Sequence, residues 1–224
     1  MRTSVMAHRG ASRAARENTV AAFLRAREMG AHAVELDVRR CASGELVVSH
    51  DPCLLPRSAL APDVPLLDEA LDACAPMWVN VEIKNDPSEP DFDDTETVAR
   101  EVAALLVTRP EPVERWLVSS FRRETTDAMR RCAPGVAVAW LCLAIPDAEL
   151  DATLAALARD GYCALHPWVG ALTRETVAAC HRHGLAVNTW TCDDPARMRE
   201  LAEWGVDGIC TNVPDLALAT LAGV

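Results

Sequence analysis

The feature that most constrains the fold of this chain is the repeated alternation of short apolar segments with longer amphipathic ones. The expected strands are Val5–His8, Val34–Val38, Leu46–His50, Trp78–Lys84, Trp116–Phe121, Val136–Leu141, Cys163–His166, Ala186–Thr191 and Gly208–Thr211. The expected helices are Thr19–Met29, Leu66–Cys74, Thr95–Val107, Glu124–Arg131, Ala148–Arg159, Thr173–His183, Pro195–Trp204 and Val213–Leu221. Alternation of strand and helix along a whole chain predicts a parallel sheet covered by helices.

One of the expected strands cannot belong to the parallel series. Only seven residues separate Val38 from Leu46, whereas a parallel crossover needs about a dozen or more. Leu46–His50 should therefore return antiparallel beside Val34–Val38, with a turn around Ser43 and Gly44. Eight parallel strands then remain, which predicts an α/β fold. We expect a (β/α)8 TIM barrel with a β-hairpin extension after the second strand and little or no insertion domain. No linker or internal repeat interrupts the pattern, so residues 1–224 should form one domain.

The composition excludes several classes of protein. The chain has 22 Lys and Arg residues against 33 Asp and Glu residues, for a formal net charge of −11, which argues against a nucleic-acid-binding surface. No apolar run approaches the ~18–20 residues of a membrane span, and the N-terminus has no secretory pattern. The nine cysteines form no CxxC pair, which is typical of reduced thiols, so we expect a cytoplasmic protein.

Acidic side chains on two of the expected strands predict a metal site. Strand residues alternate between the interior of a barrel and its helices, so Glu35 and Asp37 should point inward while their apolar neighbours face outward. On the strand that begins at Trp78, the same alternation points Asn80, Glu82 and Lys84 inward. Three carboxylates at one barrel mouth would repel one another unless a hard divalent cation lay among them. We expect one Mg²⁺ or Ca²⁺ ion, with Mn²⁺ as a third candidate; the alternative is a set of solvated charges.

Two histidines extend this cluster toward acid–base chemistry. A turn centred between Ser43 and Gly44 would pair residues whose numbers sum to 87, which places His50 across from Asp37. His8 ends the first expected strand and is followed by Arg9. A single histidine is more often structural, but two imidazoles beside a metal form a general acid and base. Arg9 and Lys84 would add positive charge for a phosphate, so the set predicts a phosphodiester site.

Several short motifs, in a fixed order, are specific as a set. They are Ala7-His8-Arg9-Gly10, Glu17-Asn18-Thr19, Glu35-Leu36-Asp37-Val38, Val48-Ser49-His50-Asp51, Glu82-Ile83-Lys84, Ser119-Ser120-Phe121, Asn188-Thr189-Trp190-Thr191, Trp204-Gly205-Val206-Asp207-Gly208-Ile209 and Thr211-Asn212-Val213-Pro214-Asp215. From about residue 6 to residue 216, the chain resembles the glycerophosphodiester phosphodiesterase family.

The resemblance implies hydrolysis of a glycerophosphodiester to glycerol 3-phosphate and an alcohol, through a cyclic phosphate formed by the glycerol 2-hydroxyl. It implies that His8 and His50 are the acid–base pair, and that Glu35, Asp37 and Glu82 hold Ca²⁺ or Mg²⁺. The family fold is also a (β/α)8 barrel.

Three further positions remain open or depart from the family pattern. Trp190 resembles a tryptophan that lines the family's pocket, although a core or rim position is an equal alternative. The short, Pro-rich segment 52–65 replaces a longer insertion in many members, and Asn212 stands where the family commonly has an acid. His166-Pro167-Trp168 follows the seventh expected strand; a rim position is favoured, and the alternative is that it reaches the substrate. We expect His181 and His183 on a helix surface, where they diverge and do not form a zinc site.

Two other functions compete with this prediction. A sphingomyelinase-D-like phospholipase shares the motif order but would need an apolar rim and secretion. A barrel that binds a phosphodiester without hydrolysing it is the non-enzymatic alternative. The substrate should be a small glycerophosphodiester; the sequence defines neither its alcohol nor the oligomeric state.

Overall fold

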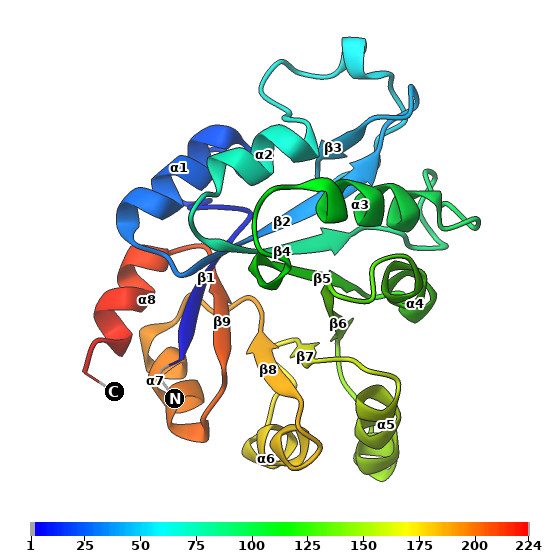
Figure 1. Ribbon diagram of the computed structural model, residues 1–224. Coiled ribbons are helices and arrows are strands. Elements are labelled where there is room, and N and C mark those ends of the chain that lie inside the picture. The colour runs from blue at the N-terminus through cyan, green and yellow to red at the C-terminus, as the bar shows by residue number, and fades with distance from the viewer. Residues whose placement is uncertain (1–2, 224) are drawn as a thin grey trace.

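The computed structural model describes residues 3–223, in which parallel strands close into a barrel. The barrel strands are β1 Ser4–His8, β2 Ala33–Arg40, β4 Trp78–Ile83, β5 Trp116–Ser120, β6 Ala137–Cys142, β7 Ala164–Pro167, β8 Ala186–Thr189 and β9 Gly208–Thr211. β1 pairs in parallel with both β2 and β9, which closes the sheet (Figure 1). The predicted (β/α)8 barrel is therefore confirmed.

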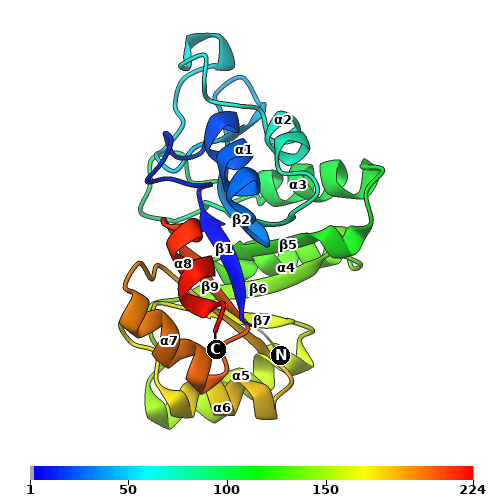
Figure 2. The ribbon, with the colours of Figure 1, turned by 90° about the vertical axis from the view of Figure 1, so that its left-hand side faces the viewer.

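Helices surround this barrel, as Figure 2 shows from a second direction. They are α1 Val20–Met29, α2 Leu67–Ala73, α3 Thr97–Thr108, α4 Arg123–Cys132, α5 Asp147–Arg159, α6 Arg174–Arg182, α7 Pro195–Trp204 and α8 Pro214–Leu221. Local sequence sets some of their ends: the Thr19 side chain accepts a hydrogen bond from the Ala22 amide, and Gly30 ends α1 with φ 84°. Among the described residues, no helix is long and apolar enough to cross a membrane.

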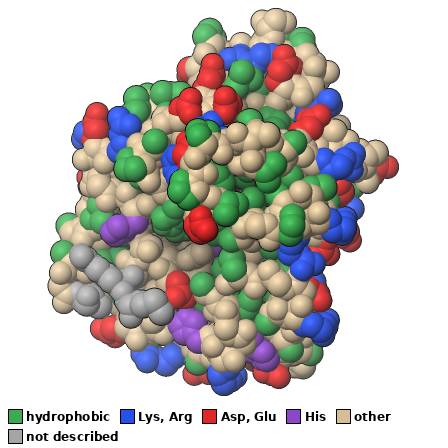
Figure 3. Space-filling view, in the orientation of Figure 1, with side chains coloured by type: hydrophobic (Ala, Val, Ile, Leu, Met, Phe, Trp, Pro, Cys, Tyr) green, Lys and Arg blue, Asp and Glu red, His purple; other side chains and the backbone are tan. Residues whose placement is uncertain are grey.

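The main core lies between the barrel and the helices. Val34, Leu36 and Val38 of β2 are fully buried and belong to the same apolar cluster as Phe23 of α1 and Leu71 of α2. The intervening residues of β2 are charged and face the barrel interior, which confirms the predicted alternation. On the molecular face shown in Figure 3, acidic and basic side chains are interspersed.

The predicted hairpin is present, but its register differs by one residue from the prediction. β3 (Leu46–Val48) runs antiparallel to β2, with Val38 opposite Val48 and Arg40 opposite Leu46. These numbers sum to 86 rather than 87, because the hairpin loop has three residues and Gly44 adopts φ 102°. Ser49 therefore lies across from Asp37, and its amide donates to the Asp37 carbonyl at 3.0 Å. The predicted pairing of His50 with Asp37 is wrong.

The segment between β3 and α2 is short and rich in proline. It carries one 3-10 turn, η1 (Arg57–Ala59), and extends from the barrel as a loop at the top of Figure 1. A second 3-10 turn, η2 (Val113–Arg115), precedes β5. The part of the chain covered by residues 3–223 thus has no insertion domain over the barrel mouth.

Candidate active site

Three carboxylates meet inside the barrel near the carboxyl ends of β2 and β4. Asp37 lies directly beside Glu82 in the β2–β4 pairing, and Glu35 is one inward position earlier. All three side chains are buried, and each offers one oxygen within 4.8 Å of the others. Glu35 Oε1 and Asp37 Oδ1 have no hydrogen-bond partner among the described residues. The structure thus brings together the predicted carboxylates.

Burial and mutual repulsion oppose ionisation in this cluster. Burial, followed by the negative charges of Asp37 and Glu82, raises the pKa of Glu35 well above its usual range. Burial and the charge of Asp37 raise the pKa of Glu82 from 4.5 to about 7, although Lys84 partly offsets them. A cluster with raised pKa values and unpartnered carboxylate oxygens has the electrostatics of a cation-binding site.

The donor set fits a hard divalent cation. All the donors are carboxylate oxygens, which are the ligands that Mg²⁺ and Ca²⁺ prefer. The three oxygens lie within 4.8 Å of one another, which is about twice a typical Ca²⁺–oxygen distance of ~2.4 Å. One oxygen from each carboxylate can therefore contact the same ion. Glu35, Asp37 and Glu82 are therefore the residues that could hold the metal.

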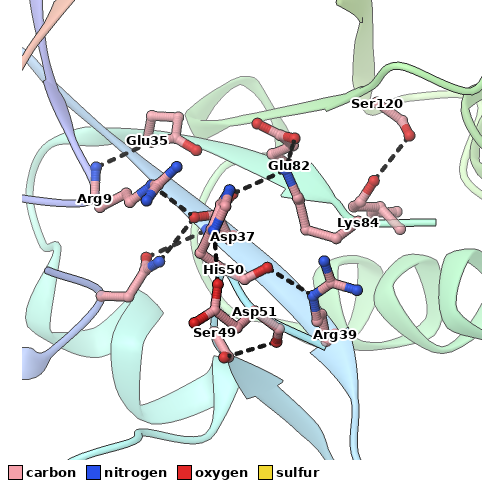
Figure 4. Close-up of polar contacts among 12 residues, drawn as sticks. Arg9, Glu35, Asp37, Arg39, Ser49, His50, Asp51, Glu82, Lys84 and Ser120 are labelled. Atoms are coloured by element: carbon pink, nitrogen blue, oxygen red, sulfur yellow. Dashed lines mark hydrogen bonds and ion pairs between the residues drawn. The ribbon is translucent and has the colours of Figure 1, made fainter. Parts of the chain in front are cut away.

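Arg9 and Lys84 supply the positive charge of the site, and both already contact carboxylates (Figure 4). Arg9 Nε lies 3.0 Å from Asp37 Oδ2, and its Nη1 lies 2.9 Å from Glu17 Oε1. Lys84 Nζ lies 2.9 Å from Glu82 Oε1 and 3.9 Å from Asp37 Oδ1. Burial opposes the charge of Lys84, but Glu82 and Asp37 outweigh it and raise the Lys84 pKa. Both side chains are therefore cationic.

The β1–α1 turn orients the carboxylates through backbone and amide groups. The Arg9 amide donates to Glu35 Oε2 at 3.0 Å, and Asn18 Nδ2 donates to Asp37 Oδ2 at 2.8 Å. Gly10 has φ 81°, and a Cβ there would lie 2.7 Å from the Ala22 backbone, so only glycine fits this turn. Asn18 was predicted only as part of a motif; its contact with Asp37 shows why an amide stands there.

A chain of hydrogen bonds orients the imidazole of His8. Asp193 Oδ2 accepts from Asn212 Nδ2 at 2.8 Å, so the Asn212 amide must turn its Oδ1 toward His8. His8 Nδ1 lies 2.7 Å from that oxygen and therefore carries the proton. His8 Nε2 is left with its lone pair, 4.0 Å from Glu35 Oε2. Asp193 was not predicted from the sequence.

The charge state of His8 follows from its surroundings. Burial lowers the pKa of His8, and this effect exceeds the opposing contribution of the Asn212 hydrogen bond. The imidazole is therefore neutral near pH 7, with an unprotonated Nε2 beside the carboxylate cluster. That is the form a general base requires.

His50 lies beyond the end of β3, at a different part of the mouth. Its Nδ1 is 3.1 Å from Asp51 Oδ1, and its side chain is 39% exposed. It lines a polar hollow together with Glu17 and Asn18, and Asn18 contacts Asp37. Among residues 3–223, no direct contact joins the His50 ring to the three carboxylates. Its catalytic role remains a prediction.

Two further side chains, an imidazole and an indole, line the interior beyond the carboxylates. Trp190 and His166 line the same cavity as His8 and Glu35, and Trp190 Nε1 donates to the His166 carbonyl at 2.8 Å. The Trp190 ring meets Phe121 edge-on, with centroids 5.5 Å apart. Trp190 thus lines this cavity and also packs against the buried cluster of Met6, Ala33 and Cys210, and its role in binding substrate remains a prediction.

The rim position predicted for His166 is wrong. β7 extends to Pro167, so strand alternation points the His166 ring inward, where it is 3% exposed. Burial lowers its pKa to about 3, so this imidazole stays neutral. In contrast, His181 and His183 contact separate surface carboxylates, those of Asp207 and Asp151, as expected of diverging residues.

The chain is similar to known phosphodiesterases. The model of the glycerophosphoryl diester phosphodiesterase family matches residues 8–61 and 55–216. A glycerophosphodiester phosphodiesterase from Caldanaerobacter subterraneus is 28% identical, over 96% of each chain. A glycerophosphodiester phosphodiesterase structure from Parabacteroides distasonis has a TM-score of 0.81 at 26% identity, with 99% of this chain and 98% of that chain covered.

A second solved structure shares the fold. An Oleispira antarctica phosphodiesterase, in complex with the product sn-glycerol-3-phosphate, has a TM-score of 0.84 at 23% identity, with 99% of this chain and 97% of that chain covered. Because the family model spans nearly all of the sequence, the chain belongs to the glycerophosphoryl diester phosphodiesterase family and is a phosphoric diester hydrolase.

Proposed function

We propose that the protein hydrolyses a glycerophosphodiester to glycerol 3-phosphate and an alcohol, with a divalent cation and with His8 and His50 as the acid–base pair. The observation that carries the proposal is the buried cluster of Glu35, Asp37 and Glu82 next to a neutral, oriented His8. The relative from Caldanaerobacter and the product bound by the Oleispira neighbour support the substrate class.

The metal ligands in this proposal are Glu35, Asp37 and Glu82. When bound there, Mg²⁺ or Ca²⁺ supplies positive charge that stabilises developing charge on the phosphoryl oxygens. Arg9 and Lys84 assist by binding the phosphoryl group. In the Arg9 guanidinium, Nη1 contacts Glu17 and Nε contacts Asp37, which leaves Nη2 for the phosphate. Trp190 forms a wall of the substrate pocket.

In the first step, His8 Nε2 takes the proton of the glycerol 2-hydroxyl while that oxygen attacks phosphorus. The bond from phosphorus to the alcohol oxygen breaks, and His50 gives a proton to the departing oxygen. A five-membered cyclic phosphate results. In the second step, the histidines exchange roles: His50 takes a proton from water, water opens the ring, and His8 returns a proton to the 2-hydroxyl. Both histidines then have their starting protonation states, and glycerol 3-phosphate is released.

The experiment is a panel of glycerophosphodiesters assayed with EDTA, Mg²⁺, Ca²⁺ and Mn²⁺. We expect release of glycerol 3-phosphate that stops on chelation and returns with at least one cation. Full activity in EDTA would refute the metal role. His8→Ala and His50→Ala should reduce turnover to a small residual rate, at least about 10²-fold lower, while the fold survives; unchanged turnover in either would remove that histidine from the mechanism.

The same panel separates the competing functions. Exposed Phe121, Leu143 and Trp168 follow β5, β6 and β7 at the mouth, which favours including a lysophospholipid as a test of the phospholipase alternative. Turnover of that lipid in preference to every glycerophosphodiester would favour it. Binding without product would favour a non-catalytic barrel.

All nine cysteines are unpaired, and on this basis we propose that the enzyme works in the cytoplasm.

A further inference from the structure

A buried arginine joins the loop that carries His50 to the loop that follows β4. Arg39 stands on β2, two residues after Asp37, with a side chain that is 1% exposed. Its Nε donates to the His50 carbonyl at 2.9 Å (Figure 4). Its Nη1 donates to both carboxylate oxygens of Asp91, at 2.8 and 2.9 Å, and its Nη2 lies 2.8 Å from Glu89 Oε2. One guanidinium thus links three segments of the chain.

The link holds the His50 loop at two points. Besides binding Arg39, Asp91 Oδ2 accepts the backbone amide of Cys53 at 2.9 Å. The segment from His50 to Cys53 is therefore held by its carbonyl at one end and by its amide at the other. A charge buried to this degree is unfavourable unless it is fully paired, and an apolar side chain could fill the same volume without that cost. Packing alone therefore does not account for a charged network at this position.

The hairpin itself does not place His50. β3 ends at Val48, and the last hydrogen bond to β2 is the one from the Ser49 amide to the Asp37 carbonyl, so strand pairing stops one residue before the histidine. The His50 ring is partly exposed, and its nearest polar partner is the exposed side chain of Asp51. In the described part of the chain, the shorter and more buried polar contact of His50 is therefore the hydrogen bond that its carbonyl accepts from Arg39.

We propose that Arg39, held by Asp91, is a positioning residue that fixes the backbone of His50 so that its imidazole reaches the substrate. The inference rests on the proposed function, in which His50 transfers a proton. Arg39 does not touch substrate in this account; it acts through the histidine.

The next residue on the strand offers a matched control. Arg40 is the same residue type, but its side chain is 41% exposed and its Nε pairs with Glu101 at 2.8 Å, away from the His50 loop. Arg40→Gln removes the same charge from β2 without touching the network.

The test compares Arg39→Gln, Asp91→Asn, Arg40→Gln, His50→Gln and the Arg39→Gln/His50→Gln double variant. Displacement by about 1 Å can cost about 10²-fold in rate, so we expect Arg39→Gln to lower kcat about 10²-fold with KM changed less than about threefold. In the His50→Gln background, the same substitution should change kcat less than about threefold, because the group it positions is absent. Arg40→Gln should match the unaltered enzyme.

Hydrogen–deuterium exchange of residues 49–55 gives a readout that needs no activity. Exchange should rise in Arg39→Gln and Asp91→Asn and stay unchanged in Arg40→Gln. If Arg39→Gln does not fold, Asp91→Asn decides, because Glu89 still pairs with the arginine; we expect about a tenfold loss of kcat and faster exchange.

Two results would overturn the inference: folded variants with unaltered exchange of residues 49–55, or an equal loss of kcat with and without His50, which indicates a purely structural role. Failure of the proposed function is seen separately. An inactive starting enzyme, or a fully active His50→Gln, refutes that function, whereas unaltered exchange in the variants refutes the hold on the loop.

Discussion

Replacing Glu82 by glutamine should stabilise the metal-free protein while abolishing hydrolysis. The pKa of Glu82 is raised from 4.5 to about 7, mainly by burial and then by the charge of Asp37. The folded protein therefore holds this proton up to about pH 7, whereas the unfolded chain releases it near 4.5. Because the folded state binds more protons in this window, the free energy of unfolding falls as pH rises through it.

The size of the effect follows from the shift. A difference from 4.5 to about 7 corresponds to about 3 kcal/mol of lost stability at pH values above the window. Glu82→Gln removes this penalty. The substitution also removes one carboxylate partner of Lys84, but Lys84 Nζ still has Asp37 Oδ1 at 3.9 Å. The gain at about pH 8 should reach up to about 3 kcal/mol, or roughly 6–12 °C in Tm.

The assay is thermal unfolding by circular dichroism in EDTA at about pH 5 and about pH 8. Tm of the unaltered protein should be higher at the lower pH, and the difference should shrink in Glu82→Gln. Added Mg²⁺ or Ca²⁺ should raise Tm of the unaltered protein at about pH 8 more than that of the variant. Glu203→Gln, which removes an exposed carboxylate from α7, is the control. A Glu82→Gln protein less stable than the control at about pH 8 would refute the reasoning.

Three further predictions follow from the His8 environment and the charge of the site. His8→Asn should lower kcat at least about 10²-fold in a steady-state assay, and a smaller loss would remove it as the base. Asn212→Asp should place a carboxylate against His8 and move the acidic limb of the kcat/KM profile upward by about one pH unit; an unmoved limb would contradict this. sn-Glycerol 3-phosphate should bind far more weakly in EDTA than with Mg²⁺ by calorimetry, and equal affinity would exclude a metal at the phosphate.

The fold and the carboxylates could be predicted because both follow from local patterns: the barrel from the alternation of strands and helices, and the carboxylates from period-two alternation within single strands. The run from Val34 to Val38 alternates apolar and acidic residues, and burying its apolar face between barrel and helix leaves Glu35 and Asp37 no direction but inward. The same reasoning applies to Glu82. Connection length then decided that Leu46–Val48 is antiparallel, since this depends only on the reach of the chain.

What could not be predicted depends on turn geometry and on contacts distant in sequence. Whether Gly44 closes a two- or a three-residue loop depends on its φ, and one residue of difference displaced His50 from Asp37. The partnership of Asn212 with Asp193 and the buried pairing of Arg39 with Asp91 join separate loops. Their residue types are common on surfaces, so sequence alone gave no reason to place them inside.

The charge of the site explains how an acidic protein can bind a phosphodiester. Glu35, Asp37 and Glu82 outnumber Arg9 and Lys84, so with all three carboxylates ionised and no cation bound, the site would repel an anion. A divalent ion held by the three carboxylates would reverse this balance, and the phosphate would in turn offer that ion further oxygen ligands. Binding of metal and substrate must then be reciprocal: whatever affinity the ion adds for the phosphodiester, the phosphodiester adds for the ion. The raised pKa values of Glu35 and Glu82 oppose ionisation of the metal-free cluster. They thus favour joint binding of the cation and the phosphodiester.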